Sequence, residues 1–190
     1  MTQKINVAVV GATGAVGGEI IKILEDRGFP LDKLYLLASS RSKGKIIEFH
    51  GEEIVVADLE EFDFSKAQIG LFSPGSKVSA EFAPKAAKAG CIVIDNTSYF
   101  RMHKDVPLIV PEVNGSALNE FFDNEERGNI IANPNCSTIQ MVVALKPIHD
   151  ASIINRVVVS TYQAVSGAGR AAMDELFNQT KNIYTNKKIE

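Results

Sequence analysis

The chain has 190 residues, of which 45% are apolar and 23% charged, and its formal net charge is −3. This length allows one domain with a hydrophobic core, or one domain and part of a second. No apolar run approaches the roughly 20 residues of a membrane helix. The Lys and Arg residues are scattered, without the basic stripe of a nucleic-acid binder, and the N-terminus lacks the pattern of a secretory signal. We therefore expect a cytoplasmic protein that binds a small molecule, with no nucleic-acid or membrane partner.

The first elements in chain order are a strand, a glycine turn and a helix. Residues 5–10 (INVAVV) form a β-branched run that stops at Gly11, which is typical of a strand buried on both faces of a parallel sheet. Residues 15–27 carry apolar side chains at helical spacing, and Gly28 follows at the position of a C-terminal cap. This order of elements opens a βαβ unit.

The same alternation of strands and helices continues along the chain and predicts an α/β fold with a Rossmann-type doubly wound parallel sheet. A small antiparallel hairpin turned at Gly51 is expected as an insertion. The further strands are expected at 34–38, 69–72 and 92–94, the helix at 79–89, and the hairpin strands at 46–49 and 53–56.

The pattern changes after Pro134. A helix is predicted over 137–145, ending near Pro147, and 157–164 is predicted to form a long strand. The tail from Asp174 is polar and helix-like in its first half. We therefore expect a nucleotide-binding domain over 1–133, followed over 134–190 by the beginning of an α+β catalytic and dimerisation domain that is truncated.

The glycine run GATGAVG follows the first strand and opens the first helix. In this position backbone N–H groups approach a pyrophosphate at the positive end of the helix. Its spacing is G-x-x-G-x-x-G, and no Gly-Lys-Ser/Thr follows, so a P-loop is excluded. A purely structural turn remains the alternative. The residues expected to bind the cofactor here are Gly11, Thr13, Gly14, Ala15 and Val16.

The second strand ends in Ser39, Arg41 and Ser42, where an NAD-dependent enzyme would offer a carboxylate to the ribose hydroxyls. Hydroxyls and a guanidinium suit a 2′-phosphate instead, so this loop favours NADP over NAD. A solvated basic loop is the alternative. Ser73 and Gly75 follow a later strand on the same edge of the sheet and are expected to contact the cofactor, although a plain turn would look the same.

Cys136 stands in the segment NPNCST, directly before a helical run. Backbone donors and the helix dipole at this position favour the thiolate, but a helix end contributes only ~0.3–1 kcal/mol, so a neighbouring base such as histidine is also needed. The alternative is a small buried residue. Cys91, in an apolar run, is expected to pack in the core. Two cysteines are too few for a disulfide framework, and no motif predicts a metal site.

Taken together, these motifs resemble the aspartate-semialdehyde dehydrogenase family, in its N-terminal portion and over essentially the whole chain. Six segments match that family in its order. They are residues 11–17, the loop at 37–42, DNTSYFR at 95–101, PEVN at 111–114, NPNCST at 133–138 and TYQAVSGAG at 161–169.

The resemblance implies NADPH-dependent reductive dephosphorylation of L-aspartyl 4-phosphate to L-aspartate 4-semialdehyde, on the way to lysine, threonine, methionine and diaminopimelate. Cys136 would attack the acyl phosphate and hold a thioester. Arg101 would bind the phosphate, and Asn135 and Gln163 would orient the substrate. The Ser166 and Gly167 backbone would lie against the nicotinamide. The intact protein is expected to be a homodimer.

One part of the family pattern has no match in this chain. The acid/base histidine and the arginine for the substrate carboxylate lie later in the family's second domain. His50, His103 and His149 are expected to be surface or capping residues. We therefore expect the chain to bind NADP and to turn over poorly or not at all. The alternatives are N-acetyl-γ-glutamyl-phosphate reductase, whose cysteine motif resembles Gly-Cys-Tyr-Pro, and a non-catalytic NADP-binding module.

Overall fold

The structure is a computed structural model that describes residues 4–122 and 128–188. The chain forms two compact units, Met1–Asn155 and Arg156–Glu190, and each is described by itself. The first unit contains the sheet and the glycine turn. The functional boundary predicted after residue 133 stays a prediction.

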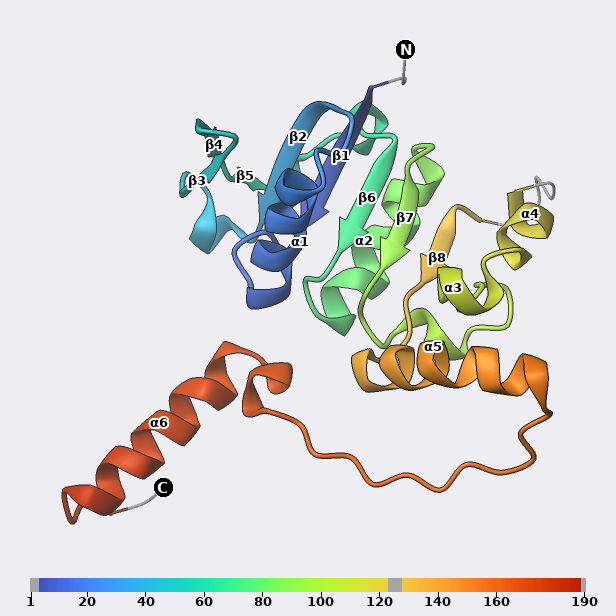
Figure 1. Ribbon diagram of the computed structural model, residues 1–190. Helices are drawn as coiled ribbons and strands as arrows, with labels where there is room; N and C mark the ends of the chain where they lie inside the picture. The colour runs from blue at the N-terminus through green and yellow to red at the C-terminus, as the bar shows by residue number, and fades with distance from the viewer. Residues whose placement is uncertain (1–3, 123–127, 189–190) are drawn as a thin grey trace. The chain divides into compact units, whose positions relative to one another are not determined.

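The first unit is built on a six-stranded sheet in which every neighbouring pair of strands is parallel, in the order β5-β2-β1-β6-β7-β8 (Figure 1). The chain order therefore reverses between β1 and β6, which is the switch point where doubly wound sheets bind ligands. The predicted Rossmann-type sheet is confirmed. Its strands are β1 (Ile5–Val10), β2 (Leu31–Ala38), β5 (Ala57–Asp58), β6 (Ile69–Phe72), β7 (Ile92–Asp95) and β8 (Ile130–Ala132).

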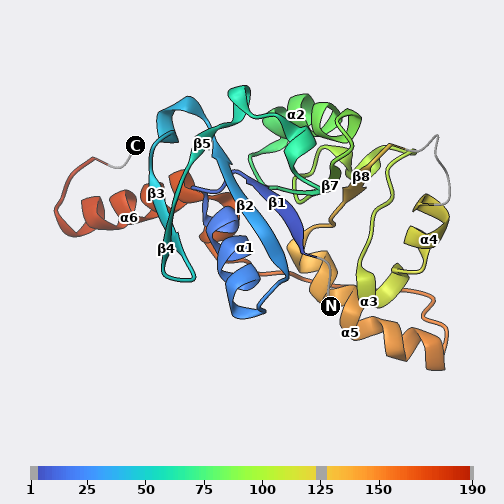
Figure 2. The ribbon, with the colours of Figure 1, turned by 90° about the horizontal axis from the view of Figure 1, so that it is seen from above.

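Helices cover both faces of this sheet. Helix α1 (Ala15–Asp26) lies on one face and α2 (Ser76–Lys88) on the other, as Figures 1 and 2 show. Side chains of β1 alternate between the two faces, so the core has two halves. Val7 and Val9 pack with Ile21 and Leu24 of α1, whereas the other half includes Ala8, Val10, Ala83 and Ala86.

The shorter elements lie around this sheet. The predicted hairpin is confirmed as an antiparallel pair, with His50 and Gly51 at positive φ values of 50° and 76° in its turn. The shorter elements are β3 (Ile46–Phe49), β4 (Glu52–Val55), α3 (Pro111–Asn114), α4 (Ala117–Phe122) and the 3-10 helices η1 (Ser40–Ser42), η2 (Leu59–Glu61), η3 (Phe64–Lys66) and η4 (Phe100–Met102).

Helix α5 (Cys136–Ala151) continues through Pro147, so the prediction that it ends near Pro147 was wrong. A proline inside a helix removes the hydrogen bond to the carbonyl four residues earlier. Here that carbonyl belongs to Val143, which is 36% exposed. The loss of this one bond does not end the helix.

The second unit contains the 3-10 helix η5 (Val165–Ala168) and helix α6 (Arg170–Tyr184). The strand predicted over 157–164 is not formed, which corrects the sequence-based expectation. A strand requires a hydrogen-bonded neighbour, and among the described residues none pairs with this segment. Its β-branched side chains are exposed instead, Val158 at 85%.

Candidate functional site

The glycine turn after β1 lies between the ends of β2 and β6. The Gly11 N–H donates to the Leu37 carbonyl at 2.9 Å, and the Ser73 N–H donates to the Val10 carbonyl at 2.8 Å. Gly11 has a φ of +87°, and a Cβ placed on it would lie 2.8 Å from the Ser73 carbonyl. Both the backbone conformation and the close approach therefore require glycine here.

Helix α1 begins at this turn with Gly14 as its N-cap, and no side chain caps it. The first N–H groups of a helix have no partner within the helix, and the helix dipole makes this end positive. A Cβ on Gly17 would lie 2.1 Å from the Gly11 carbonyl oxygen, so the helix packs directly onto the turn. The arrangement suits an anion such as a phosphate.

A pocket of about 340 Å³ opens at this turn. Most of its lining comes from the carboxyl ends of β1, β2 and β6, which parallel strands place at one edge of the sheet, and the rest comes from η2 and α2. The Thr13 Oγ1 hydroxyl donates to Ser42 Oγ at 3.4 Å, so the glycine turn also contacts the loop after β2. The structure thus brings together six of the residues predicted to bind the cofactor: Gly11, Thr13, Gly14, Ser39, Arg41 and Ser73.

Four other residues of the first unit that were predicted to bind the cofactor do not line this pocket. Ala15 and Val16 form the first turn of α1, and Val16 is exposed. Ser42 reaches the turn through Thr13. Gly75, with a φ of +94°, is the N-cap of α2. Their contacts with a cofactor stay predictions.

Sequence reasoning missed one charged residue in the pocket. Glu60 lines it together with Arg41, although the sequence suggested no carboxylate near the end of β2. Glu60 lies in η2, directly after β5, and β5 pairs with β2 through Ala38 and Asp58. A two-residue strand has no periodicity to detect. The pocket lining therefore contains one cationic and one anionic side chain. These two charges do not decide whether the pocket prefers NADP or NAD.

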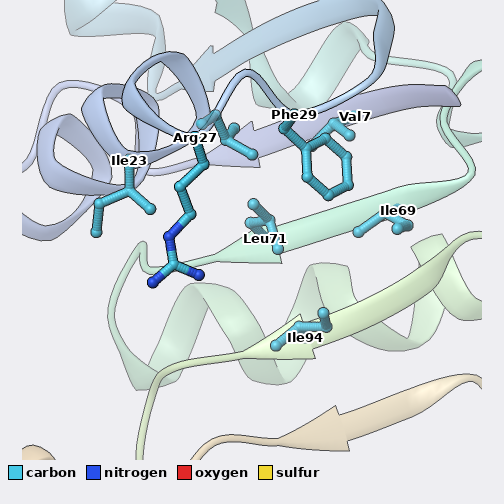
Figure 3. A pocket seen from close by; sticks show the side chains of 8 residues that line it. Val7, Ile23, Arg27, Phe29, Ile69, Leu71 and Ile94 are labelled. Carbon is cyan, nitrogen blue, oxygen red and sulfur yellow. The ribbon is translucent and has the colours of Figure 1, made fainter. Parts of the chain in front are cut away.

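A second hollow, of about 230 Å³, lies on the α1 side of the sheet. Figure 3 shows Arg27 at the edge of a lining that is otherwise apolar, with Leu71 and Ile94 on neighbouring strands. None of the predicted site residues lines it. It is therefore separate from the glycine pocket.

Cys136 is the first residue of α5 and is exposed. The Asn135 side chain caps the helix, because its Oδ1 accepts from the Ser137 N–H at 3.0 Å and the Thr138 N–H at 3.3 Å. The alternative that Cys136 is a small buried residue was therefore wrong. Cys91 is fully buried, as predicted, and burial raises its pKa to about 11.

Arg101 lies close to the segment that carries Cys136. Its Nε donates to the Asn133 carbonyl at 2.9 Å, and its Nη2 donates to the Asn96 carbonyl at 3.1 Å. These two residues directly follow β8 and β7. The guanidinium is thus fixed at the same edge of the sheet. Asn133, whose carbonyl it holds, precedes Cys136 by three residues in the chain.

The remaining predicted residues belong to the second unit. The side chain of Gln163 lies over Gly167, since a Cβ on Gly167 would come 1.8 Å from Gln163 Nε2. Ser166 directly precedes Gly167 in the 3-10 helix η5. The three residues are close to one another, and their position relative to Cys136 stays a prediction.

Each histidine has a local structural contact. The His50 backbone N–H donates to Glu25 Oε1 at 2.6 Å, and His103 packs against the rings of Tyr99 and Phe100. Near the end of α5, His149 Nδ1 accepts from a backbone N–H at 3.3 Å. None of the three lines the glycine pocket, which agrees with the expected surface or capping roles.

Comparison with known families gives two matches along the chain. Residues 6–121, more than half of the chain, match the domain described as "Semialdehyde dehydrogenase, NAD binding domain". The chain belongs to the semialdehyde dehydrogenase family. Residues 145–190 match "Semialdehyde dehydrogenase, dimerisation domain". This order of family domains agrees with the resemblance deduced from the motifs.

Among curated members of the semialdehyde dehydrogenase family, the chain is 57% identical to aspartate-semialdehyde dehydrogenase 2 of Vibrio cholerae, over 100% of the chain and 55% of the relative. It is 53% identical to aspartate-semialdehyde dehydrogenase of Bacillus subtilis, over 100% of the chain and 53% of the relative. The chain therefore spans about half the length of the curated relatives it matches.

Solved structures of the family agree. The crystal structure of Vibrio cholerae aspartate semialdehyde dehydrogenase II complexed with ASA matches with a TM-score of 0.93 and 55% identity, over 100% of this chain and 55% of that one. The Candida albicans aspartate semialdehyde dehydrogenase structure with NADP matches with a TM-score of 0.68 and 28% identity, over 80% of this chain and 48% of that one. Across residues 4–122 and 128–188, no helix is long and apolar enough to span a bilayer.

Proposed function

We propose that this semialdehyde dehydrogenase chain carries the cofactor-binding and nucleophile-bearing part of an NADP-dependent aspartate-semialdehyde dehydrogenase. The observation that carries the proposal is the presence, in one compact unit, of a glycine-lined pocket and an exposed cysteine at the start of a helix. Relatives that are 53–57% identical and bear that enzyme's name support it.

A dinucleotide fits the pocket on two grounds. A side chain on Gly11 would fill the space against Ser73, and the start of α1 has no side-chain cap. Gly11, Thr13 and Gly14 would therefore hold the pyrophosphate. Arg41, with the neighbouring hydroxyls of Ser39 and Ser42, would bind a 2′-phosphate and select NADP. The structure with NADP from Candida albicans is consistent with this choice.

In the proposed reaction the Cys136 thiolate attacks the acyl carbon of L-aspartyl 4-phosphate. A bond forms between sulfur and carbon, and the bond between carbon and the phosphate oxygen breaks, so inorganic phosphate leaves with the electron pair. When bound, the reduced nicotinamide supplies the hydride that converts the resulting thioester to the aldehyde. The sulfur–carbon bond then breaks and the thiolate is restored.

Other residues of the chain would orient this substrate. Two N–H groups of Arg101 hold backbone carbonyls, and a guanidinium has five N–H donors, so others would bind the phosphate. Asn135 would use its side-chain NH₂, because its Oδ1 caps α5. Gln163 would orient the substrate from the second unit, with Ser166, Gly167, Ala15, Val16 and Gly75 near the cofactor.

The broader assignments belong to the same proposal. The product would serve lysine, threonine, methionine and diaminopimelate synthesis in the cytoplasm, and the intact protein would be a homodimer. N-acetyl-γ-glutamyl-phosphate reductase is the second candidate by chemistry, but the named relatives favour the aspartyl substrate.

Acylation of Cys136 tests the proposal without requiring the whole catalytic cycle. The chain is incubated with L-aspartyl 4-phosphate, and its intact mass is measured with and without added NADPH. We expect an aspartyl adduct on the parent and on Cys91→Ala, and none on Cys136→Ala. NADP titration followed by fluorescence gives the parallel measurement of binding.

The outcomes separate the rival functions. NADP binding without acylation would make the chain a non-catalytic binding module. Acylation by N-acetyl-γ-glutamyl phosphate in preference to the aspartyl substrate would favour the other reductase. An adduct that persists in Cys136→Ala would contradict the assigned nucleophile.

A further inference from the structure

We propose that Asn96 and Asn133 are positioning residues that hold Cys136 and Arg101 in one fixed arrangement. The pair, called here the Asn96–Asn133 clamp, joins the residues that directly follow β7 and β8 through a hydrogen bond from Asn133 Nδ2 to Asn96 Oδ1 at 2.6 Å. The inference rests on the proposed function, since it takes Cys136 as the nucleophile.

Asn133 is fixed by three hydrogen bonds. Its backbone N–H donates to the Asp95 carbonyl at 2.8 Å, and its carbonyl accepts from Arg101 Nε at 2.9 Å. The side-chain bond to Asn96 is the third. Its two backbone polar groups and its amide NH₂ thus all have partners, and the residue lies at the end of a buried strand.

Little freedom remains between Asn133 and the nucleophile. Pro134 follows, and its ring fixes its own φ. Asn135 comes next, with its side chain bonded to the first N–H groups of α5. Because Pro134 and Asn135 are both constrained, the position of Asn133 determines where helix α5 begins and therefore where Cys136 lies.

Asn96 is fixed from the other side. Its N–H donates to the Phe72 carbonyl at 2.8 Å, which ties it to β6, and its carbonyl accepts from Arg101 Nη2 at 3.1 Å. Arg101 therefore bridges the carbonyls of the same two asparagines whose side chains bond to each other. The segments that follow β7 and β8 are therefore joined twice, once by the side-chain bond between the two asparagines and once by the Arg101 guanidinium.

The clamp is anchored to Asp95, a buried residue that directly precedes Asn96 and whose carbonyl accepts from the Asn133 N–H. Asp95 is 0% exposed, and its carboxylate accepts from Ser79 Oγ at 2.6 Å, from the Thr97 N–H at 3.1 Å and from Thr97 Oγ1 at 2.8 Å. A buried carboxylate with several donors is held firmly in place. The polar segment 95–101 thus connects helix α2 to Arg101 through the clamp.

The clamp should affect the rate of Cys136 acylation, because it maintains the geometry between Cys136 and Arg101. A nucleophile and a phosphate-binding group must keep their mutual geometry, and a displacement of about 1 Å can cost a rate factor on the order of 100. Asn96 and Asn133 would act through Cys136 and Arg101, without contact with the substrate. Loss of either amide would loosen both groups together.

The test uses the charge preference of Cys136 alkylation in the full 190-residue chain. Rates with anionic iodoacetate and neutral iodoacetamide are measured from about pH 6 to about pH 9, with Cys136→Ser as the blank. A nearby guanidinium favours the anionic reagent, and the ratio of the two rates cancels changes in simple exposure. We expect the ratio to fall by up to about fivefold in Asn96→Ala and in Asn133→Ala, the size of one exposed charge interaction.

Two further variants make the test specific. In the double variant we expect no further fall, because the two amides act as one unit. Asn114→Ala is the matched control: Asn114 Oδ1 accepts from the Val110 N–H at 2.8 Å and its Nδ2 donates to the Leu108 carbonyl at 3.0 Å, apart from the clamp. It should lower the urea midpoint and leave the rate ratio unchanged. A serine replaces the alanine if an alanine variant does not fold.

The outcomes also distinguish the inference from the proposed function. A ratio unchanged in folded Asn96→Ala and Asn133→Ala, or one that falls equally in Asn114→Ala, overturns the clamp. If the parent shows no preference for iodoacetate, and Cys136 reacts as a free thiol in solution does, the assignment of Cys136 and Arg101 to one site fails first.

Discussion

Gly17 lies directly against Gly11, at a distance that leaves no room for a side chain. A Cβ on Gly17 would come 2.1 Å from the Gly11 carbonyl oxygen. The contact seats helix α1 on the turn that lines the pocket. Gly18, the next residue of the same helix, has nothing within 4 Å of its Cβ position. The two neighbouring glycines therefore have opposite tolerance for substitution.

The first prediction compares these two positions. Gly17→Ala should destabilise the chain by about 3 kcal/mol or more and remove NADP binding, because backbone atoms must shift. Gly18→Ala should stabilise it by about 0.5–1 kcal/mol, since alanine is the better helix former. Urea unfolding and NADP titration check both. Equal stability of the two variants would contradict the close packing of α1 on the turn.

A second prediction concerns cofactor choice. Arg41→Ala should weaken NADP binding by about 10–100-fold, the worth of a charged hydrogen bond, and leave NAD binding nearly unchanged. Lys43→Ala is the control from the same loop, because Lys43 pairs with Glu61 at 2.5 Å and does not line the pocket. Fluorescence titration with both nucleotides measures the effect. An equal loss of NAD and NADP affinity would remove Arg41 as the selector.

Glu60 provides a related prediction, since its side chain shares the pocket with Arg41. A carboxylate accepts hydrogen bonds from ribose hydroxyls but repels a 2′-phosphate. Glu60→Gln should therefore improve the preference for NADP over NAD, by up to about fivefold for one partly screened charge. The same titrations check it. A preference unmoved by the substitution would place Glu60 outside the cofactor's contacts.

The buried thiol of Cys91 predicts a loss of stability at alkaline pH. Burial raises its pKa from 9.0 to about 11. Both states hold the proton below pH 9, so its full contribution is present there. Between pH 9 and about 11 the unfolded chain ionises and the folded chain does not. The free energy of unfolding should therefore fall, by about 2–3 kcal/mol at 1.36 kcal/mol per unit.

Cys91→Ala isolates this contribution from the lysines and tyrosines that also titrate in the alkaline range. Urea unfolding at a series of pH values should show a shallower decline for the variant than for the parent. Parallel declines in the two proteins would mean that Cys91 does not carry the effect.

The cap on α5 predicts different effects for two substitutions of Asn135. Asn135→Ala removes the acceptor for two N–H groups and should cost about 1 kcal/mol, whereas Asn135→Asp keeps the cap and the stability. Both variants lose the side-chain NH₂, so both should slow acylation of Cys136 by about tenfold or more. Normal acylation of Asn135→Asp would show that the NH₂ group does not contact the substrate.

Much of the fold follows from local sequence. The runs at β1, β6 and β7 are mostly apolar, as is typical of strands in a parallel sheet, and this pattern predicts the sheet, although one face of β6 and β7 is only partly buried. The same reasoning predicts that residues after successive strands meet at one edge. Gly11, Ser39 and Ser73 do line one pocket. The six matching segments, among them the glycine run and the cysteine motif, were together sufficient to indicate the family, which the family match over residues 6–121 confirms.

Other features were decided by tertiary structure, because they depend on partners that local periodicity does not reveal. Glu60 reaches the pocket through a strand of two residues, and 157–164 stays unpaired despite its β-branched composition. The bond between Asn96 and Asn133 joins residues 37 positions apart. A sequence pattern reports which side chains are buried, whereas hydrogen-bond partners and strand neighbours are selected only when distant segments pack together.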